Sequence, residues 1–233
     1  MTAEHDRRIA EMFDRISPRY DLLNRVLSFG TDVSWRRRAI ARARLGPGER
    51  GLDVGVGTGD LSVGLLAASD PTSAVTGVDL APRMLALGRA RLARFGSRYD
   101  AVIGSATALP FPDAAFDRVV TAFTIRNVGD LPLALGEFRR VLRSGGRAVL
   151  LELSHPARAF APVYWWYFER VAPLVAVALG GDPDAYRYLP RSLRVFPTAD
   201  RLARLVRDAG FAGVRVERLS LGIAALVVAE TGP

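Results

Sequence analysis

The 233-residue sequence contains no cysteine and no lysine, and only two histidines, His5 and His155. The absence of cysteine excludes disulfide bonds, thiolate nucleophiles and zinc–thiolate centres. Two histidines are too few for a histidine-based metal cluster, so we predict no metal site. The charged N-terminus is not followed by an apolar core, so we expect no signal peptide. With 49% hydrophobic and 24% charged residues, the composition indicates a single globular domain over 1–233.

All 32 basic residues are arginine, and the formal net charge is +8. Such a charge would favour anionic partners, either nucleic acid or phospholipid headgroups. The arginines are dispersed, however, with short clusters only at 36–38 and 139–140. Dispersed charge is typical of solvated helix faces, so we expect no nucleic-acid partner.

A glycine-rich segment, Leu-Asp-Val-Gly-Val-Gly-Thr-Gly-Asp, occupies residues 52–60. Gly55, Gly57 and Gly59 permit a tight turn and a close approach of the backbone to a ligand. Asp79 follows twenty residues after the last of these glycines, and an acid at this distance can accept hydrogen bonds from a ribose diol. The pairing predicts a site for a nucleoside cofactor.

The spacing differs from that of a dinucleotide site, which requires Gly or Ala where this chain has Asp60. Asp60 and the leading Asp53 also make the loop less suited to a pyrophosphate than to a partly cationic ligand. We therefore predict that the cofactor is S-adenosylmethionine.

Apolar runs alternate with stretches of helical periodicity, which favours parallel strands joined by crossover helices. The predicted strands are 50–55, 74–79, 99–103, 116–122, 147–153, 213–220 and 223–230, and the predicted helices are 60–68, 82–94 and 131–142. Only Leu221-Gly222 separates the last two strands, which predicts an antiparallel hairpin.

Two segments lie outside this alternation: a helical cap at about 5–45, and an insertion at about 156–197. Ligands of doubly wound sheets bind beyond the carboxyl ends of the strands, where the insertion leaves the fifth strand. We therefore predict that both segments select the substrate, with the insertion as a lid. Its stretch 160–181 carries Trp and Tyr beside an uncharged run of eleven residues, too short to span a bilayer. Such a stretch suits an interfacial position or a pocket wall, and an internal core helix is the alternative.

Several motifs together resemble the ubiquinone/menaquinone biosynthesis C-methyltransferase family. They are Met12-Phe13-Asp14-Arg15-Ile16, Arg19-Tyr20-Asp21-Leu22-Leu23-Asn24, Leu109-Pro110-Phe111, Ile125-Arg126-Asn127-Val128, Arg140-Val141-Leu142-Arg143 with Gly145-Gly146, and Tyr186-Arg187-Tyr188-Leu189-Pro190 with Ser192. The likeness runs from about residue 11 to 226. The tyrosine-containing segments and Ile-Arg-Asn-Val are its most specific parts.

The resemblance implies a class I methyltransferase: a Rossmann-like α/β fold with a seven-stranded sheet, helices on both faces and an antiparallel last strand. It further implies methyl transfer from S-adenosylmethionine to a ring carbon of a polyprenylated quinol. The compact length is most similar to that of the enzymes converting demethylmenaquinol to menaquinol. The family's cofactor contacts, carried over by position, fall on Thr58, Asp79, Ser105, Ala106 and Ala122.

The chain departs from the family pattern at several positions. Position 55 is Gly where the family commonly has Ala or Cys, and Thr124 stands where Gly is usual. Val227 stands where His often follows the final Ala-Leu. We expect Thr124 and Val227 to border the substrate side, where they favour an alternative acceptor such as another lipophilic phenol or natural product.

A quinol carbon becomes nucleophilic when a ring hydroxyl loses its proton, so the site requires a base or a cation that stabilises the phenolate. Arg126 follows the fourth strand and suits the second role, while Asn127 could orient the ring hydroxyl. A salt bridge with a turn cap is the alternative for both residues. His155 is a candidate proton acceptor, and Tyr20, Tyr186 and Tyr188 are candidates for stacking on the ring.

Two further alternatives stay open at this point: a nucleic-acid-binding protein, and a cofactor-binding regulator without catalysis. With the enzyme interpretation we expect a cytoplasmic protein at the inner face of the cell membrane, with peripheral membrane contact. A homodimer is left open.

Overall fold

The computed structural model describes residues 2–232 and contains a seven-stranded sheet in the order β3-β2-β1-β4-β5-β7-β6. The strands are β1 (Arg50–Val54), β2 (Ala74–Asp79), β3 (Tyr99–Ile103), β4 (Phe116–Ala122), β5 (Leu142–Leu153), β6 (Gly213–Leu219) and β7 (Ala224–Glu230). β1 to β5 pair in parallel, and β7 runs antiparallel between β5 and β6. The predicted α/β sheet with an antiparallel last strand is confirmed.

The predicted hairpin joins β6 to β7 through Ser220–Gly222. Ser220 and Leu221 have φ angles of 48° and 57°, a left-handed conformation that reverses the chain within a short link. β7 enters the sheet beside β5, so it is buried between two neighbouring strands rather than at an edge.

Helices cover both faces of the sheet because its central strands are apolar on both sides. On β5, Ala148 and Leu150 pack toward one face, and Val149 and Leu151 pack toward the other. The first face is covered by α6 (Leu131–Val141) and α10 (Ala199–Asp208), and the second by α3 (Thr31–Ala43) and α4 (Asp60–Ala68). Next to β3 lies α5 (Pro82–Leu92).

Element boundaries differ from prediction by more than one residue at two places. α5 ends at Leu92, and a 3₁₀ segment continues to Arg98. β5 begins at Leu142 instead of 147, because the chain leaves α6 directly into the sheet. A shift of register between Phe116 and Arg118 of β4, with Gly145 at a φ of 72°, accommodates the extra residues.

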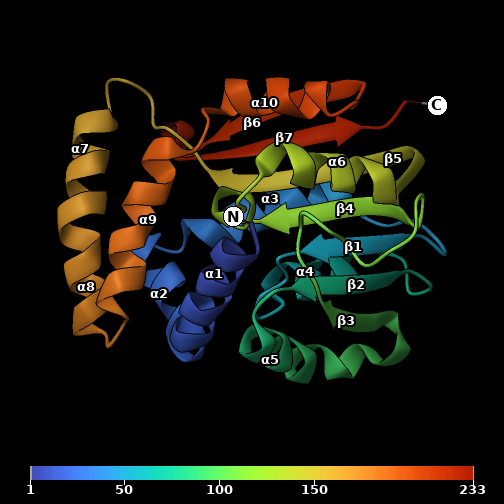
Figure 1. Cartoon of the computed structure of the whole chain (residues 1–233), viewed down its shortest axis with the longest axis horizontal. Coiled ribbons are helices and arrows are strands. Elements are labelled where there is room, and N and C mark those ends of the chain that lie inside the picture. Colours follow the sequence, from blue (N-terminus) through green and yellow to red (C-terminus); the bar gives the residue numbers. More distant parts are fainter. Residues whose placement is uncertain (1, 233) are drawn as a thin grey trace.

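The helices outside the alternation gather at the carboxyl ends of the parallel strands (Figure 1). From the N-terminus come α1 (Thr2–Ile16) and α2 (Tyr20–Leu27). From the insertion come α7 (Ala161–Trp166), a π-helical segment (Tyr167–Val171), α8 (Ala172–Ala178) and α9 (Pro183–Val195).

The predicted cap at about 5–45 includes α3, which packs differently from α1 and α2. Trp35, Ala39 and Ala43 bury α3 against the sheet, so most of this helix belongs to the layered core. Among residues 2–232, no helix is both long enough and apolar enough to pass through a bilayer.

Candidate active site

The glycine-rich loop connects β1 to α4 in a conformation that its glycines make possible. Gly55, Gly57 and Gly59 have φ angles of 71°, 54° and 85°, in the left-handed region that favours glycine. The backbone N–H groups of Gly55 and Val56 both donate to the carbonyl oxygen of Val78, at 2.7 and 3.1 Å. The loop is thereby held against the end of β2.

Asp79 ends β2 and is joined directly to this loop. Its carboxylate accepts hydrogen bonds from the backbone N–H groups of Gly57 at 2.8 Å and Ala81 at 2.9 Å. Burial raises the pKa of Asp79, and the two N–H groups oppose this shift. Each carboxylate oxygen keeps a lone pair for a further donor such as a ribose hydroxyl.

A cavity of about 70 Å³, hereafter the cofactor cavity, lies between this loop and α1. Its lining includes five residues predicted to contact the cofactor: Gly55, Gly57, Asp79, Ser105 and Ala106. Its charged lining residues are Asp79 and Asp6 of α1, and no basic residue of the described chain lines it. Carboxylates without a basic neighbour suit a cationic ligand, so the residues present fit S-adenosylmethionine.

Three other residues predicted at the cofactor do not line this cavity. The hydroxyl of Thr58 donates to Asp21 of α2 at 2.7 Å. Gly59 precedes the first residue of α4, and a Cβ there would lie 2.6 Å from Leu92, so it serves close helix packing. Ala122 packs among the core residues under α3.

Helix α1 narrows the cofactor cavity. The carboxylate of Asp6 accepts a hydrogen bond from the hydroxyl of Ser105 at 2.8 Å, and Nε2 of His5 lies 2.8 Å from the carbonyl oxygen of Asn127. Small-molecule sites in proteins commonly enclose roughly 300–1,000 Å³. The cofactor cavity is smaller than this range, and α1 forms one of the walls that limit it.

Asp53 on β1 is a buried acid close to the cofactor loop. It is 1% exposed, and its carboxylate accepts a hydrogen bond from the hydroxyl of Ser62 at 2.6 Å. Burial raises the pKa of Asp53 to about 7, and the neighbouring charge of Asp79 adds to this shift. A positive ligand in the cofactor cavity would favour the charged form of both acids.

A second cavity of about 430 Å³, hereafter the acceptor cavity, lies under the cap and the insertion. Its lining is largely apolar and comes from α1–α3, the insertion helices and the ends of β4 and β5. Tyr20, Arg126, Asn127, Tyr186 and Tyr188, all predicted at the substrate, line it. Four residues line both cavities and so separate them: Phe13, Tyr20, Phe123 and Asn127.

Arg126 lies in the 3₁₀ segment Ile125–Asn127 after β4 and forms a buried ion pair with Glu152 of β5. Nε of Arg126 lies 3.3 Å from Oε1 of Glu152, and Nη1 donates to the hydroxyl of Ser192 on α9 at 2.7 Å. Burial raises the pKa of Glu152, and the guanidinium opposes the shift. The salt bridge and the lining position occur together, so the guanidinium is held in a fixed orientation at the wall of the acceptor cavity.

Three polar atoms around the acceptor cavity have no hydrogen-bond partner among the described residues. They are Oδ1 of Asn127 and the hydroxyls of Tyr164 and Tyr186, all buried. An unsatisfied buried polar atom costs about 1–3 kcal/mol. A ligand carrying hydroxyl or carbonyl oxygens would satisfy such atoms, whereas a pure hydrocarbon would not.

Two residues that the sequence placed near the substrate lie away from it. His155 lines neither cavity: its Nε2 is 2.9 Å from the carbonyl oxygen of Phe196, and its ring packs edge-on against Trp165. Val227 is fully buried in the core beneath α10 and lines neither cavity. The expectation that Val227 borders the substrate side is wrong, because β7 carries it to the middle of the sheet.

Phe123 and Glu152 were not predicted from the sequence. Phe123 has a φ of 61°, unusual for a bulky residue, and such strain is concentrated at functional sites. That conformation leaves no mark in the sequence. Glu152 did leave a signal, because it is the one charged residue in the apolar run 148–153.

Comparisons with known proteins agree with this geometry. The model of the ubiE/COQ5 methyltransferase family matches residues 1–230. The chain is 47% identical to the demethylmenaquinone methyltransferase of Thermus thermophilus over 220 residues, which are 94% of this chain and 99% of that protein. It is 43% identical to the ubiquinone/menaquinone biosynthesis C-methyltransferase UbiE of Geobacter sulfurreducens, covering 98% of this chain and 90% of that protein.

Among solved structures, a SAM-dependent methyltransferase of Thermotoga maritima superimposes with a TM-score of 0.69 at 22% identity, covering 95% of this chain and 99% of that one. The cyclase SpnF gives a TM-score of 0.71 at 20% identity, covering 96% and 95%. These two structures are similar in fold alone. The sequence matches extend over the whole site, so the chain belongs to the ubiE/COQ5 methyltransferase family and is an S-adenosylmethionine-dependent C-methyltransferase of quinone biosynthesis.

Proposed function

We propose that the acceptor is a polyprenylated demethylmenaquinol and that its methylation yields menaquinol. The observation that carries this proposal is the acceptor cavity: it is large and apolar, and it is separated from the cofactor cavity only by shared side chains. The name of the Thermus thermophilus relative points to the same substrate. The three unpartnered polar atoms provide hydrogen bonds for a ring with two oxygens.

When bound, S-adenosylmethionine supplies a methyl group on a sulfonium, which is already a strong electrophile. The chain then has to hold the acceptor ring in line with it and favour the phenolate. Arg126 serves the second purpose, because its charge is permanent and its guanidinium is fixed by Glu152 and Ser192.

Asn127 and Tyr20 stand between the two cavities and are proposed to align the ring. Oδ1 of Asn127 is free to accept a hydrogen bond from a quinol hydroxyl. Tyr20 is partly buried, and desolvation raises its pKa, so it stays neutral and can donate a hydrogen bond. His155 stays a candidate proton acceptor from the sequence alone, because its ring lies outside the acceptor cavity and its Nε2 faces the carbonyl oxygen of Phe196.

The cap and the insertion are proposed to choose the acceptor, with α7–α9 as the lid. Tyr186, Tyr188 and Leu189 come from α9, and Met12, Phe13 and Ile16 come from α1. The sheet itself contributes only strand ends, so a change of acceptor within this fold requires changes in these helices.

The proposed reaction is tested by incubating pure protein with radiolabelled S-adenosylmethionine and demethylmenaquinol. Labelled menaquinol is expected. The same assay with a ubiquinol precursor and with a short phenolic acceptor measures selectivity. Label transferred only to another phenol would support the alternative, a methyltransferase for a different lipophilic acceptor, which Thr124 at the edge of the cofactor cavity motivates.

The acceptor's prenyl tail keeps it in the lipid bilayer, so we propose that the enzyme works in the cytoplasm at the inner face of the cell membrane. The enzyme must then take its substrate from lipid or from a carrier.

A further inference from the structure

Apolar side chains form an exposed stripe along the outer side of the insertion. From α7 through α8 the stripe contains Val163, Trp166, Leu174 and Val177, which are 58%, 62%, 72% and 45% exposed. Their spacing of three, eight and three residues places them on one side of a continuous helical segment. The opposite side of that segment, with Tyr164, Phe168 and Ala172, is buried.

A second apolar stripe lies beside the first, on α2 and the turn that follows. Leu22, Val26 and Phe29 are 57%, 38% and 78% exposed and lie four and three residues apart. The two stripes are joined where the ring of Phe29 packs against Tyr167, with centroids 5.4 Å apart, and where Tyr167 donates to the carbonyl oxygen of Leu27 at 3.1 Å. We call these two stripes together the apolar face.

The acceptor cavity opens through the apolar face. Phe29, Val163 and Trp166 line the cavity and are also more than half exposed. A ligand passing between these three side chains would move directly from the cavity to whatever covers the face.

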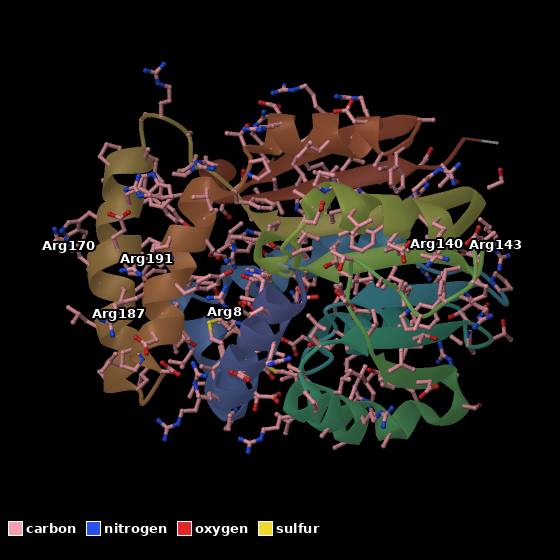
Figure 2. The ribbon with its side chains drawn as sticks, in the orientation of Figure 1. Arg8, Arg140, Arg143, Arg170, Arg187 and Arg191 are labelled. Carbon is pink, nitrogen blue, oxygen red and sulfur yellow. The ribbon has the colours of Figure 1, made fainter. Side chains whose placement is uncertain are left out.

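The charge around the apolar face is positive. Arg170 lies within the first stripe, between Trp166 and Leu174, and points away from the body of the protein (Figure 2). The insertion 156–197 contains five arginines and three acids. Among the described residues, no acid lies within ion-pair distance of Arg158, Arg170 or Arg191, whereas Glu169 is paired with Arg194.

We propose that the apolar face docks on a bilayer containing anionic phospholipid, so that the acceptor cavity opens into the lipid. An exposed Trp and Phe beside aliphatic side chains match the interfacial region of a membrane, and the free guanidinium groups match lipid phosphates. A soluble protein partner would not account for the three exposed side chains of the face that also line the acceptor cavity. The inference rests on the proposed lipophilic acceptor for its purpose, but lipid binding can be measured without any acceptor.

The experiment compares vesicle binding by the full-length protein and two double variants. Arg170→Glu with Leu174→Glu alters the apolar face at positions that do not line the cavity. Leu133→Glu with Arg204→Glu makes the same two exchanges at exposed positions on α6 and α10, far from the face. Co-sedimentation uses vesicles of phosphatidylcholine alone and vesicles that also contain phosphatidylglycerol.

We expect the native protein and the α6/α10 variant to bind the phosphatidylglycerol vesicles, with weaker binding to phosphatidylcholine and at high salt. The Arg170/Leu174 variant should bind about tenfold or more weakly. This variant should methylate a short-chain acceptor in detergent-free buffer at the native rate. An equal rate would show that the variant is folded. Equal vesicle binding by both variants, or none by the native protein, would overturn the inference.

The outcomes separate this inference from the proposed function. Vesicle binding without methylation of any quinol keeps the docking face and rejects the acceptor. Methylation of a soluble quinol without vesicle binding keeps the proposed acceptor and rejects the docking face. A homodimer that the Arg170/Leu174 variant dissociates, with no vesicle binding by the native protein, would assign the face to a second copy of the chain and overturn the membrane interpretation.

Discussion

The two cavities differ in the charged residues that surround them, although Tyr20, Phe123 and Asn127 line both. Around the cofactor cavity, Asp53 is buried and Asp79 is half-buried, neither forms an ion pair with any described residue, and desolvation raises the pKa of both. Around the acceptor cavity, the buried acid Glu152 is neutralised by Arg126. The cofactor side therefore has no cation among the described lining residues, whereas the acceptor side holds the guanidinium groups of Arg36 and Arg126.

The cavities also differ in their origin. The cofactor cavity is built on strand ends and the turns that follow them, and α1 with Tyr20 of α2 closes one side of it. The acceptor cavity is built mainly from helices that pack on one another at the end of the sheet. An enzyme built in this way can change its acceptor through the helices at the end of the sheet and keep the strand ends at its methyl-donor site.

The largest effect is expected for Arg126→Ala, which removes one of the two guanidinium groups that line the acceptor cavity, the other being that of Arg36. Methyl transfer should fall about 10²–10³-fold, in the range for loss of one group that stabilises a developing anion. Affinity for S-adenosylmethionine, measured by calorimetry, should stay within about twofold because Arg126 does not line the cofactor cavity.

The single variant also leaves Glu152 buried without its partner, which commonly costs about 3–5 kcal/mol of stability. Arg126→Ala combined with Glu152→Gln serves as the control, since it removes the uncompensated charge. The double variant should recover thermal stability but not turnover. A single variant with native turnover would reject the role of Arg126.

A smaller effect is expected for Asp53→Asn on the cofactor side. The folded protein binds the Asp53 proton more tightly than the unfolded chain, whose aspartate pKa is about 3.9. This residue therefore lowers stability progressively as the pH rises from about 4 to about 7. The variant should be more stable than the native protein at pH 8, by about 2–4 kcal/mol, and equally stable near pH 4.

Thermal unfolding across this pH range measures the Asp53 effect. Calorimetry in two buffers of different ionisation enthalpy provides a second readout: the native protein should release protons when it binds S-adenosylmethionine near pH 7, and Asp53→Asn should release fewer. Equal pH profiles for the two proteins would contradict the interpretation.

Asp79→Ala should weaken cofactor binding by about 1.5–3 kcal/mol, the range for hydrogen bonds to a charged acceptor. The variant also frees the N–H of Gly57 from its partner and so loosens the loop. Asp60→Ala is a matched control, because Asp60 belongs to the same loop region but does not line the cofactor cavity and pairs with Arg25, Arg36 and Arg91 instead. Equal losses in both variants would show a general effect of charge instead of a direct contact.

The smallest expected effect tests whether Gly55 and Thr124 are coupled. A Cβ at position 55 would lie 2.1 Å from Oγ1 of Thr124, so Gly55→Ala should lower stability by about 1–3 kcal/mol. Adding Thr124→Gly should restore part of the loss, with a coupling of about 0.5–3 kcal/mol in a double-mutant cycle. Additive effects would mean that the left-handed φ of Gly55 alone requires glycine.

Gly55 and Thr124 also show a contact that could not be predicted from the sequence. Position 55 and position 124 each depart from the family pattern, and the sequence presents them as two separate facts. The structure brings them into contact across the ends of β1 and β4, so that the side chain at 124 fills the space that a side chain at 55 would need. A single sequence does not reveal that positions 55 and 124 share this space.

Other parts of the site were predictable to different degrees. Asp79 and its loop were found because strand, turn and acid follow one another within thirty residues. Arg126 was found, but its partners Glu152 and Ser192 were not, since they lie 26 and 66 residues away in the chain. Thr58 was assigned to the cofactor, yet its hydroxyl is bonded to Asp21 of the cap, and only the packing of α2 shows this.

The sequence by itself determined the sheet, the glycine-rich loop and the position of Asp79 beside that loop. Each depends on local periodicity or on backbone freedom at particular glycines. The tertiary structure decided where the acceptor cavity lies and which side chains divide the two cavities. It also decided that Asp53 and Asp79 have no ion-pair partner among the described residues, whereas Glu152 pairs with Arg126. These features depend on which distant segments pack together. That packing is governed by burial of apolar surface, which has no direction along the chain and leaves no fixed spacing in the sequence.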